Sequence, residues 1–391
     1  MAQDEAAAVA AVQDGPGGGG LLTGSSTGRE IAQQPDVWRA TAQVVSDRRA
    51  AVDELVRAAL ADPTTRVVLT GAGTSSFAGE VLAPELSRLL ARPVEAVATT
   101  DVVSDPTAVT AGARPVLLVS FARSGNSPES VAAADQLEDL VPVLHHLVIT
   151  CDGGGDLARR WEGRERSVVL TLPPATNDRG FAMTSSFTSM ALAALLCSGA
   201  EVDVEALAGA AEDVLGRVED LATALAVERP DRLVYLGSGA LKGLAHESAL
   251  KCLELTAGGL VALGESSMAF RHGPKSVLDA ATVAVVYLSG DPYTRAYDVD
   301  IAVELVAALG GDRVVVVDHE GVPGARLWQV PRGAGWSDAL WALVAVVPAQ
   351  AAALACSLAR GLTPDDPFPG GEVNRVVQGV VIHPLPQQRT A

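Results

Sequence analysis

Aromatic and basic residues are both scarce in this sequence. Phe, Trp and Tyr make up 4% of its 391 residues, and 29 Lys and Arg stand against 47 Asp and Glu, for a formal net charge of -18. No run of Lys or Arg offsets this acidity, so the chain would repel nucleic-acid phosphates and anionic lipid. We therefore expect no nucleic-acid partner and no membrane partner. A small anionic ligand stays compatible with the charge, because backbone N–H groups and helix N-termini bind such ligands locally.

Cysteine is rare, and the first residues lack the features of a secretory signal. The four cysteines have neither CxxC nor zinc-finger spacing, which favours buried free thiols in a reducing compartment. Residues 1–12 carry two acids and no base, unlike a signal peptide. These features predict a cytoplasmic protein without a metal site.

One uncharged stretch, 339–359, is long enough to cross a bilayer. It is mostly alanine, a weak driver of membrane insertion, and Pro348 and Gln350 lie near its middle. We predict that this stretch is a core helix.

The length and the 48% apolar content predict two globular domains. From residue 66, short apolar segments alternate with helical patterns, which is typical of α/β folds with parallel sheets. The expected strands are 67–69, 95–98, 116–120, 147–150 and 168–172, followed by a second series at 233–236, 282–288 and 314–317. We predict a disordered tail over 1–28, a first domain over 29–215 and a second domain over 216–391.

The two series begin alike, which suggests a duplicated domain. Val67 to Gly73 and Leu233 to Gly239 each run an apolar strand into a GxG turn. In the first copy the turn continues as Gly73-Thr74-Ser75-Ser76. Glycines let the backbone approach a ligand, and the hydroxyls and the following helix N-terminus suit a phosphate. A dinucleotide site would need a third glycine where Ser76 stands, so NAD is disfavoured.

A second hydroxyl-rich loop follows the strand at 116–120. It contains Arg123, Ser124 and Ser127, with Pro128 placed as the first residue of a helix. Loops at the carboxyl ends of neighbouring parallel strands converge on one crevice, so the two loops together predict a phosphate site. The alternative is that these hydroxyls only cap helices.

Three charged residues share one face of a predicted helix. Glu247, Lys251 and Glu254 are spaced i, i+4, i+7 among apolar neighbours. A surface ion pair would explain Glu247 and Lys251, but charges in an apolar setting are costly unless they are paired or take part in chemistry. A carboxylate on a rigid helix is suited to moving a proton between adjacent carbons.

These motifs resemble those of a known family. The run Arg123 to Ser127 resembles the SGxT/S signature of sugar-isomerase (SIS) domains, which bind phosphosugars. His246 to Thr256 and Phe270 to Ser276 resemble the ExALKxxE and HGP segments of double-SIS enzymes that act on hexosamine phosphates. With 178–186 and 373–379, the sequence is similar over about 27–385 to the bacterial galactosamine-6-phosphate deaminase/isomerases, also called tagatose-6-phosphate ketose/aldose isomerases.

The resemblance implies a fold and a set of roles. Each SIS domain is expected to be a flavodoxin-like three-layer sandwich, and no cofactor is expected. Glu254 matches the proton-shuttling position, Lys251 would stabilise an enolate oxygen, and Glu247 would orient Lys251 or the substrate. His272 matches a ring-opening histidine that relatives supply from a neighbouring subunit, which implies a homo-oligomer. Further pocket candidates are Asp101, Thr184, Asn374 and Arg375.

The predicted function is deamination of galactosamine 6-phosphate with isomerisation to tagatose 6-phosphate. Glucosamine-6-phosphate deamination and plain aldose-ketose isomerisation use the same residues, and both stay open. A related synthase is disfavoured because it needs an amidotransferase domain and a late lysine that this sequence lacks. A non-catalytic phosphosugar sensor is the alternative from another class, although the tail is too short for a helix-turn-helix domain.

Overall fold

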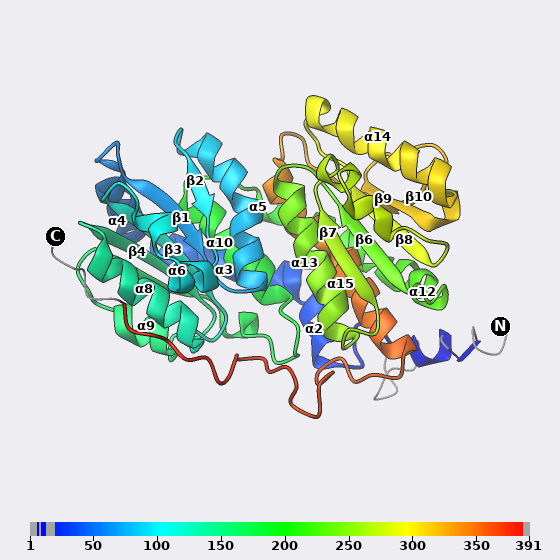
Figure 1. Ribbon diagram of the computed structural model, residues 1–391, viewed down its shortest axis with the longest axis horizontal. Helices are drawn as coiled ribbons and strands as arrows, with labels where there is room; N and C mark the ends of the chain where they lie inside the picture. Colours follow the sequence, from blue (N-terminus) through cyan, green and yellow to red (C-terminus); the bar gives the residue numbers. More distant parts are fainter. Residues whose placement is uncertain (1–5, 8, 13–19, 386–391) are drawn as a thin grey trace.

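The computed structural model describes residues 6–7, 9–12 and 20–385, and it contains two parallel five-stranded sheets (Figure 1). The first sheet has the spatial order β2-β1-β3-β4-β5 and the second the order β10-β9-β8-β6-β7. Read from the other edge, the second order repeats the first, and both are the doubly wound 2-1-3-4-5 order. The predicted α/β class and the duplication are confirmed.

The elements of the first half follow the alternation that the sequence predicts. Its strands are β1 (Arg66–Thr70), β2 (Val94–Ala96), β3 (Val116–Ala122), β4 (Leu144–Thr150) and β5 (Ser167–Thr171). One face is covered by α3 (Gln34–Asp47), α4 (Arg49–Leu60), α5 (Thr74–Leu89) and α10 (Ser185–Cys197). The other face is covered by α6 (Thr99–Ser104), α7 (Thr107–Thr110), α8 (Pro128–Leu140) and α9 (Asp156–Trp161). The sheet therefore lies between two helical layers.

The second half is built in the same way. Its strands are β6 (Arg232–Leu236), β7 (Val261–Glu265), β8 (Thr282–Tyr287), β9 (Val314–Asp318) and β10 (Arg326–Gln329). Its helices are α12 (Val218–Val227), α13 (Ala240–Leu255), α14 (Pro292–Leu309) and α15 (Asp338–Ala359), and α11 (Val204–Leu215) connects the halves. Short 3-10 turns are η1 (Pro174–Thr176), η2 (Ala269–Arg271), η3 (Pro274–Val277) and η4 (Gly311–Arg313).

The strand predictions missed β7 and β10. Both are edge strands of the second sheet, and their polar or glycine-containing sequences VALGE and RLWQ lack the apolar run of a central strand. An edge strand is paired on one side only, so its sequence carries a weaker signal.

The two halves share one hydrophobic core. Alternate residues of β3, such as Leu117, Val119 and Phe121, face this core, and so do Leu233 and Tyr235 of β6. Helix α15 runs through it, and the helix is fully buried although it is long and apolar enough to cross a membrane. The predicted core helix is thus confirmed. The only polar group near its middle, Gln350, accepts a hydrogen bond from Gln34 Nε2 at 2.9 Å.

The N-terminal prediction needs a correction. Part of the tail predicted over 1–28 lies outside the described residues, but 20–28 are ordered. Leu21 is buried, and α2 (Ser26–Ala32) begins with its Ser26 and Thr27 N–H groups donating to the Asp365 carboxylate at 2.7 and 2.8 Å. Because Asp365 lies more than 300 residues away, local composition could not indicate this contact. The domain boundary at residue 215 stays a prediction, with the two sheets on either side of it.

Candidate active site

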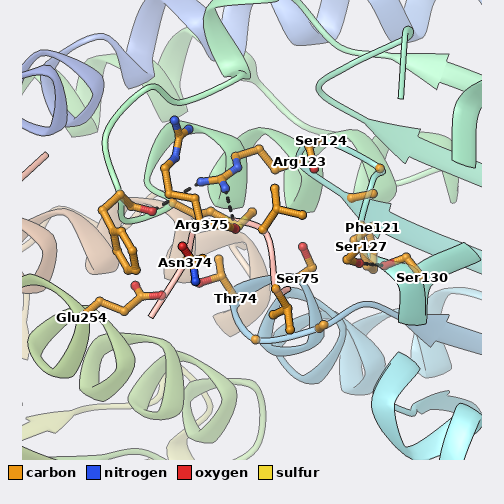
Figure 2. A pocket seen from close by; sticks show the side chains of 18 of the residues that line it. Thr74, Ser75, Phe121, Arg123, Ser124, Ser127, Ser130, Glu254, Asn374 and Arg375 are labelled. Carbon is orange, nitrogen blue, oxygen red and sulfur yellow. Dashed lines mark hydrogen bonds between the residues drawn. The ribbon is translucent and has the colours of Figure 1, made fainter. Parts of the chain in front are cut away.

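The loop after β1 forms one wall of a cavity of about 240 Å³ (Figure 2). It ends at Gly73, whose φ of +56° favours glycine. Thr74 and Ser75 form the first turn of α5 and line the cavity. Since the N-terminus of a helix carries partial positive charge and free N–H groups, this wall suits an anion.

The loop after β3 supplies a second wall. Arg123, Ser124 and Ser127 line the same cavity, as the two-loop prediction requires. Ser127 is the first residue before α8 but makes no side-chain capping bond; its hydroxyl instead pairs with the Ser130 hydroxyl at 2.6 Å. The capping alternative therefore does not explain these hydroxyls.

Helix α13 brings the carboxylate of Glu254 to the cavity from the second half. Behind it, the fully buried Lys251 ammonium donates to Glu254 Oε2 at 2.5 Å and to Thr74 Oγ1 at 2.9 Å. Its distance to Glu247 Oε1 is 3.4 Å, close enough for an ion pair. Lys251 thus joins α13 of the second half to the Thr74 loop of the first half.

This arrangement differs from the predicted role of Lys251. The sequence indicated a cation that contacts the substrate, but Lys251 does not line the cavity, and acceptors on three sides enclose its ammonium group.

Burial raises the pKa of Glu247 to about 8, against the attraction of Lys251. Burial alone would lower the pKa of Lys251, but Glu247 and Glu254 outweigh it and the pKa is raised. Lys251 therefore stays protonated despite its burial, because both glutamates lie within ion-pair distance of its ammonium group.

The third wall comes from the segment after α15. This segment crosses from the second half to the first along one edge of the molecule (Figure 1). Residues 373–377 line the cavity, including the predicted Asn374 and Arg375. Arg375 donates to the Asp178 carbonyl, and Arg123 donates to the Arg375 carbonyl at 3.0 Å. The segment therefore closes the cavity through contacts between residues about 200 to 250 positions apart.

Two guanidinium groups give the cavity a positive end (Figure 2). Arg123 and Arg375 donate to backbone carbonyls, and neither forms an ion pair with an acid among the described residues. Burial lowers the pKa of Arg123, and the charge of Arg375 lowers it further. A bound anion would relieve this repulsion, so the cavity favours a phosphate although the whole chain is acidic.

Three predicted site residues lie elsewhere. Asp101 is exposed in the first turn of α6, where an acidic side chain stabilises the start of the helix. Thr184 is fully buried and does not line the cavity, and its backbone N–H donates to the Asp178 carboxylate at 2.8 Å. His272 is exposed between η2 and η3 and does not reach this chain's cavity.

Sequence reasoning missed most of the apolar lining. Phe121, Phe181 and Met183 line the cavity, together with valines of the closing segment. The Asp178 carboxylate accepts from Ser185 and Ser186 at the start of α10 and holds the 178–184 loop that carries Phe181 and Met183. These stretches were recognised as motifs, but apolar residues in a loop carry no signal that separates a pocket wall from a core contact.

The second half repeats the turn without repeating the site. Gly239 has φ and ψ of +58° and -124°, close to the +56° and -126° of Gly73. There, however, Ser238 Oγ donates to Asp298 at 2.6 Å and Ser289 Oγ donates to Asp338 at 2.5 Å. The chain's own carboxylates accept the hydrogen bonds that a phosphate would need, so the hydroxyl donors of the cavity come from the first half alone.

Comparison with known proteins identifies a matching domain family, close relatives and a similar crystal structure. The family model of the SIS domain matches residues 59–197. The AgaS protein of Streptomyces coelicolor is 56% identical, over 92% of this chain and 95% of that protein. The D-galactosamine-6-phosphate deaminase AgaS of Escherichia coli is 41% identical, over 93% of this chain and 96% of that protein. The crystal structure of tagatose-6-phosphate ketose/aldose isomerase from Escherichia coli has a TM-score of 0.86 and 38% identity, covering 94% of this chain and 99% of that chain.

Proposed function

Because the chain belongs to the SIS-domain enzyme family that contains the D-galactosamine-6-phosphate deaminases, we propose that it converts galactosamine 6-phosphate into tagatose 6-phosphate and ammonia. The family membership that the motifs predicted is confirmed. One observation carries the proposal: Glu254 is the sole carboxylate among the described lining residues of a cavity whose other polar groups suit a phosphate. An anionic sugar bound there would meet one base.

The binding step uses the first half and the closing segment. Thr74, Ser75, Ser124 and Ser127 offer hydroxyls to phosphate oxygens, and the positive end of the α5 helix dipole lies at the same cavity. Arg123 and Arg375 add positive charge at the same cavity. These contacts hold the phosphate so that the carbons at the other end of the open-chain sugar reach Glu254.

The chemical step needs one base that acts twice. Glu254 takes the proton from C2 of the open-chain amino sugar while O1 gains a proton from water, which gives an enolamine. Glu254 then returns its proton to C1, and the nitrogen gives up a proton to water. The product carries an imine at C2. Water adds to that carbon, the C–N bond breaks, and ammonia leaves with the ketose phosphate.

Lys251 and Glu247 act behind Glu254. The Lys251–Glu254 pair fixes the position of the carboxylate, and the contact with Thr74 relates it to the phosphate loop. Glu247, whose Oε1 lies 3.4 Å from Lys251 Nζ, adds a second acidic neighbour that keeps this buried ammonium group charged.

We also propose that His272 opens the sugar ring from a second copy of the chain. Its imidazole is exposed and lies away from the cavity of its own chain, which is what such sharing would require. A homo-oligomer and a cytoplasmic location remain predictions that follow from this role and from the composition.

The proposal is tested with galactosamine 6-phosphate and glucosamine 6-phosphate in parallel, measuring ammonium and ketose phosphate. Glu254→Gln keeps the shape and removes the base, so turnover should fall about a hundredfold to ten-thousandfold while binding persists. The matched control is Glu138→Gln, which removes an exposed glutamate paired with Arg164 outside the cavity and should leave turnover unchanged.

Four outcomes would change the conclusion. Ketose formation from an added aldose 6-phosphate, with no ammonium from either amino sugar, would reduce the activity to plain isomerisation. Faster turnover of the gluco epimer would change the substrate. Binding of phosphosugar with no product from either substrate would favour a sensor, and full activity of Glu254→Gln would move the base elsewhere.

A further inference from the structure

The loop that carries His272 is anchored to α14, on the outer side of the second half (Figure 1). Phe270 is fully buried in the core beneath this helix, and Ser267 Oγ donates to Asp298 Oδ1 at 2.5 Å. Beyond Phe270 the chain turns sharply, with a φ of +124° at Gly273. The turn η3 that follows contains no fully buried residue, and only Val277 at its end packs against the core beneath α14.

One carboxylate of α14 holds the loop on both sides of the histidine. Arg271 Nε donates to Glu304 Oε2 at 2.8 Å, and Lys275 Nζ donates to Glu304 Oε1. Hydrogen bonds from Lys275 and from Arg271 lower the pKa of Glu304, so it is ionised at neutral pH. The His272 ring itself makes no hydrogen bond to any of the described residues.

Arg271, Lys275 and Glu304 are half-buried, and an ion pair that water still reaches adds little stability because its charges are well solvated when apart. Glu304 therefore matters less for stability than for geometry. It joins the residue before His272 to the residue three positions after it, and so ties both flanks of the histidine to α14. Without it, the side chains that flank His272 would lose this common anchor.

We propose that Glu304 is a positioning residue that holds the Arg271–Lys275 loop so that the unpartnered His272 imidazole enters the cavity of a second copy. The inference rests on the proposed ring-opening role of His272. Catalysis is sensitive to such placement, since a displacement of about 1 Å can cost about a hundredfold in rate.

The test compares Glu304→Gln with Asp300→Asn in the full-length protein. Asp300 is exposed on the same helix and has no ion pair among the described residues, so its substitution makes the same charge change without touching the loop. We expect Glu304→Gln to lower kcat for galactosamine 6-phosphate about tenfold to a hundredfold, with KM and melting temperature close to those of Asp300→Asn. In ¹⁵N-histidine spectra, which contain six histidines, the His272 signal should move in Glu304→Gln only.

His272→Ala separates the two ideas. Full activity of His272→Ala would refute the proposed role of the histidine. An inactive His272→Ala together with wild-type kcat in Glu304→Gln would refute the positioning role alone. A fall in kcat with an unmoved His272 signal and a lower melting temperature would show that Glu304 only stabilises the fold, which also overturns the inference.

Discussion

Gly243 sets the distance between the two helices that build the active site. It lies on α13 where this helix crosses α5, and a Cβ placed on it would be 2.7 Å from the Val81 nitrogen and 2.8 Å from Glu80 Cβ. Ordinary contact begins near 3.4 Å, and the Val81 atom belongs to the backbone, so the atoms cannot give way by a rotamer change. In Gly243→Ala the helices must separate by about 0.7 Å at this point.

This separation falls on the bond that joins the two halves of the site. Lys251 Nζ lies 2.9 Å from Thr74 Oγ1, and adding the full displacement takes the pair beyond hydrogen-bond distance. Glu254 would then move away from the phosphate loop. We expect kcat to fall about tenfold to a hundredfold, with a much smaller change in KM. Overpacking lowers the free energy of unfolding by about 1–3 kcal/mol, and the higher helix propensity of Ala offsets up to about 1 kcal/mol of this loss.

The assay is steady-state ammonium release, with urea unfolding of the same samples. Gly209→Ala is the control, since it adds the same methyl group to helix α11 where nothing lies within 4 Å, and it should keep full activity and gain slight stability. Wild-type kcat in a folded Gly243→Ala would refute the reasoning, because the geometry of the site would then not depend on this crossing.

Three further predictions follow from individual contacts. Thr74→Val removes the acceptor of Lys251 and should lower kcat as well as affinity, whereas loss of affinity alone would limit Thr74 to phosphate binding. Arg375→Met should raise KM about tenfold to a hundredfold for the phosphorylated sugar; an equal effect on the dephosphorylated sugar would contradict the phosphate role. Burial raises the pKa of Glu30 to about 7, with Asp178 adding to the shift, against an ordinary 4.5. The stability that protonated Glu30 contributes is fully present below about pH 4.5 and is lost as the pH rises through 7. The free energy of unfolding should therefore decline less between pH 5.5 and 8 in Glu30→Gln than in the wild type, and equal declines would exclude Glu30 as a source.

The motifs predicted most of the cavity, because each was a local pattern with a local cause. A GxG turn after an apolar strand, and serines before Pro128, mark strand ends whatever lies around them. The helix spacing of Glu247, Lys251 and Glu254 likewise placed them on one face. Spacing could not tell which of the three is open to the cavity, because exposure depends on what packs against the helix. Only Glu254 lines the cavity, whereas Lys251 is enclosed by Thr74 from a segment 177 positions earlier.

The sequence by itself determined the α/β class, the duplication, the two hydroxyl-rich loops and the family, since these depend on residue order within short windows. Tertiary structure alone decided that Thr74 encloses Lys251, which leaves Glu254 as the carboxylate open to the cavity, and that Glu304 holds the loop of His272. Each of these is a contact between distant segments, and its strength comes from burial and exact spacing in three dimensions. Such contacts leave no periodic trace in the chain, so no local pattern could have indicated them.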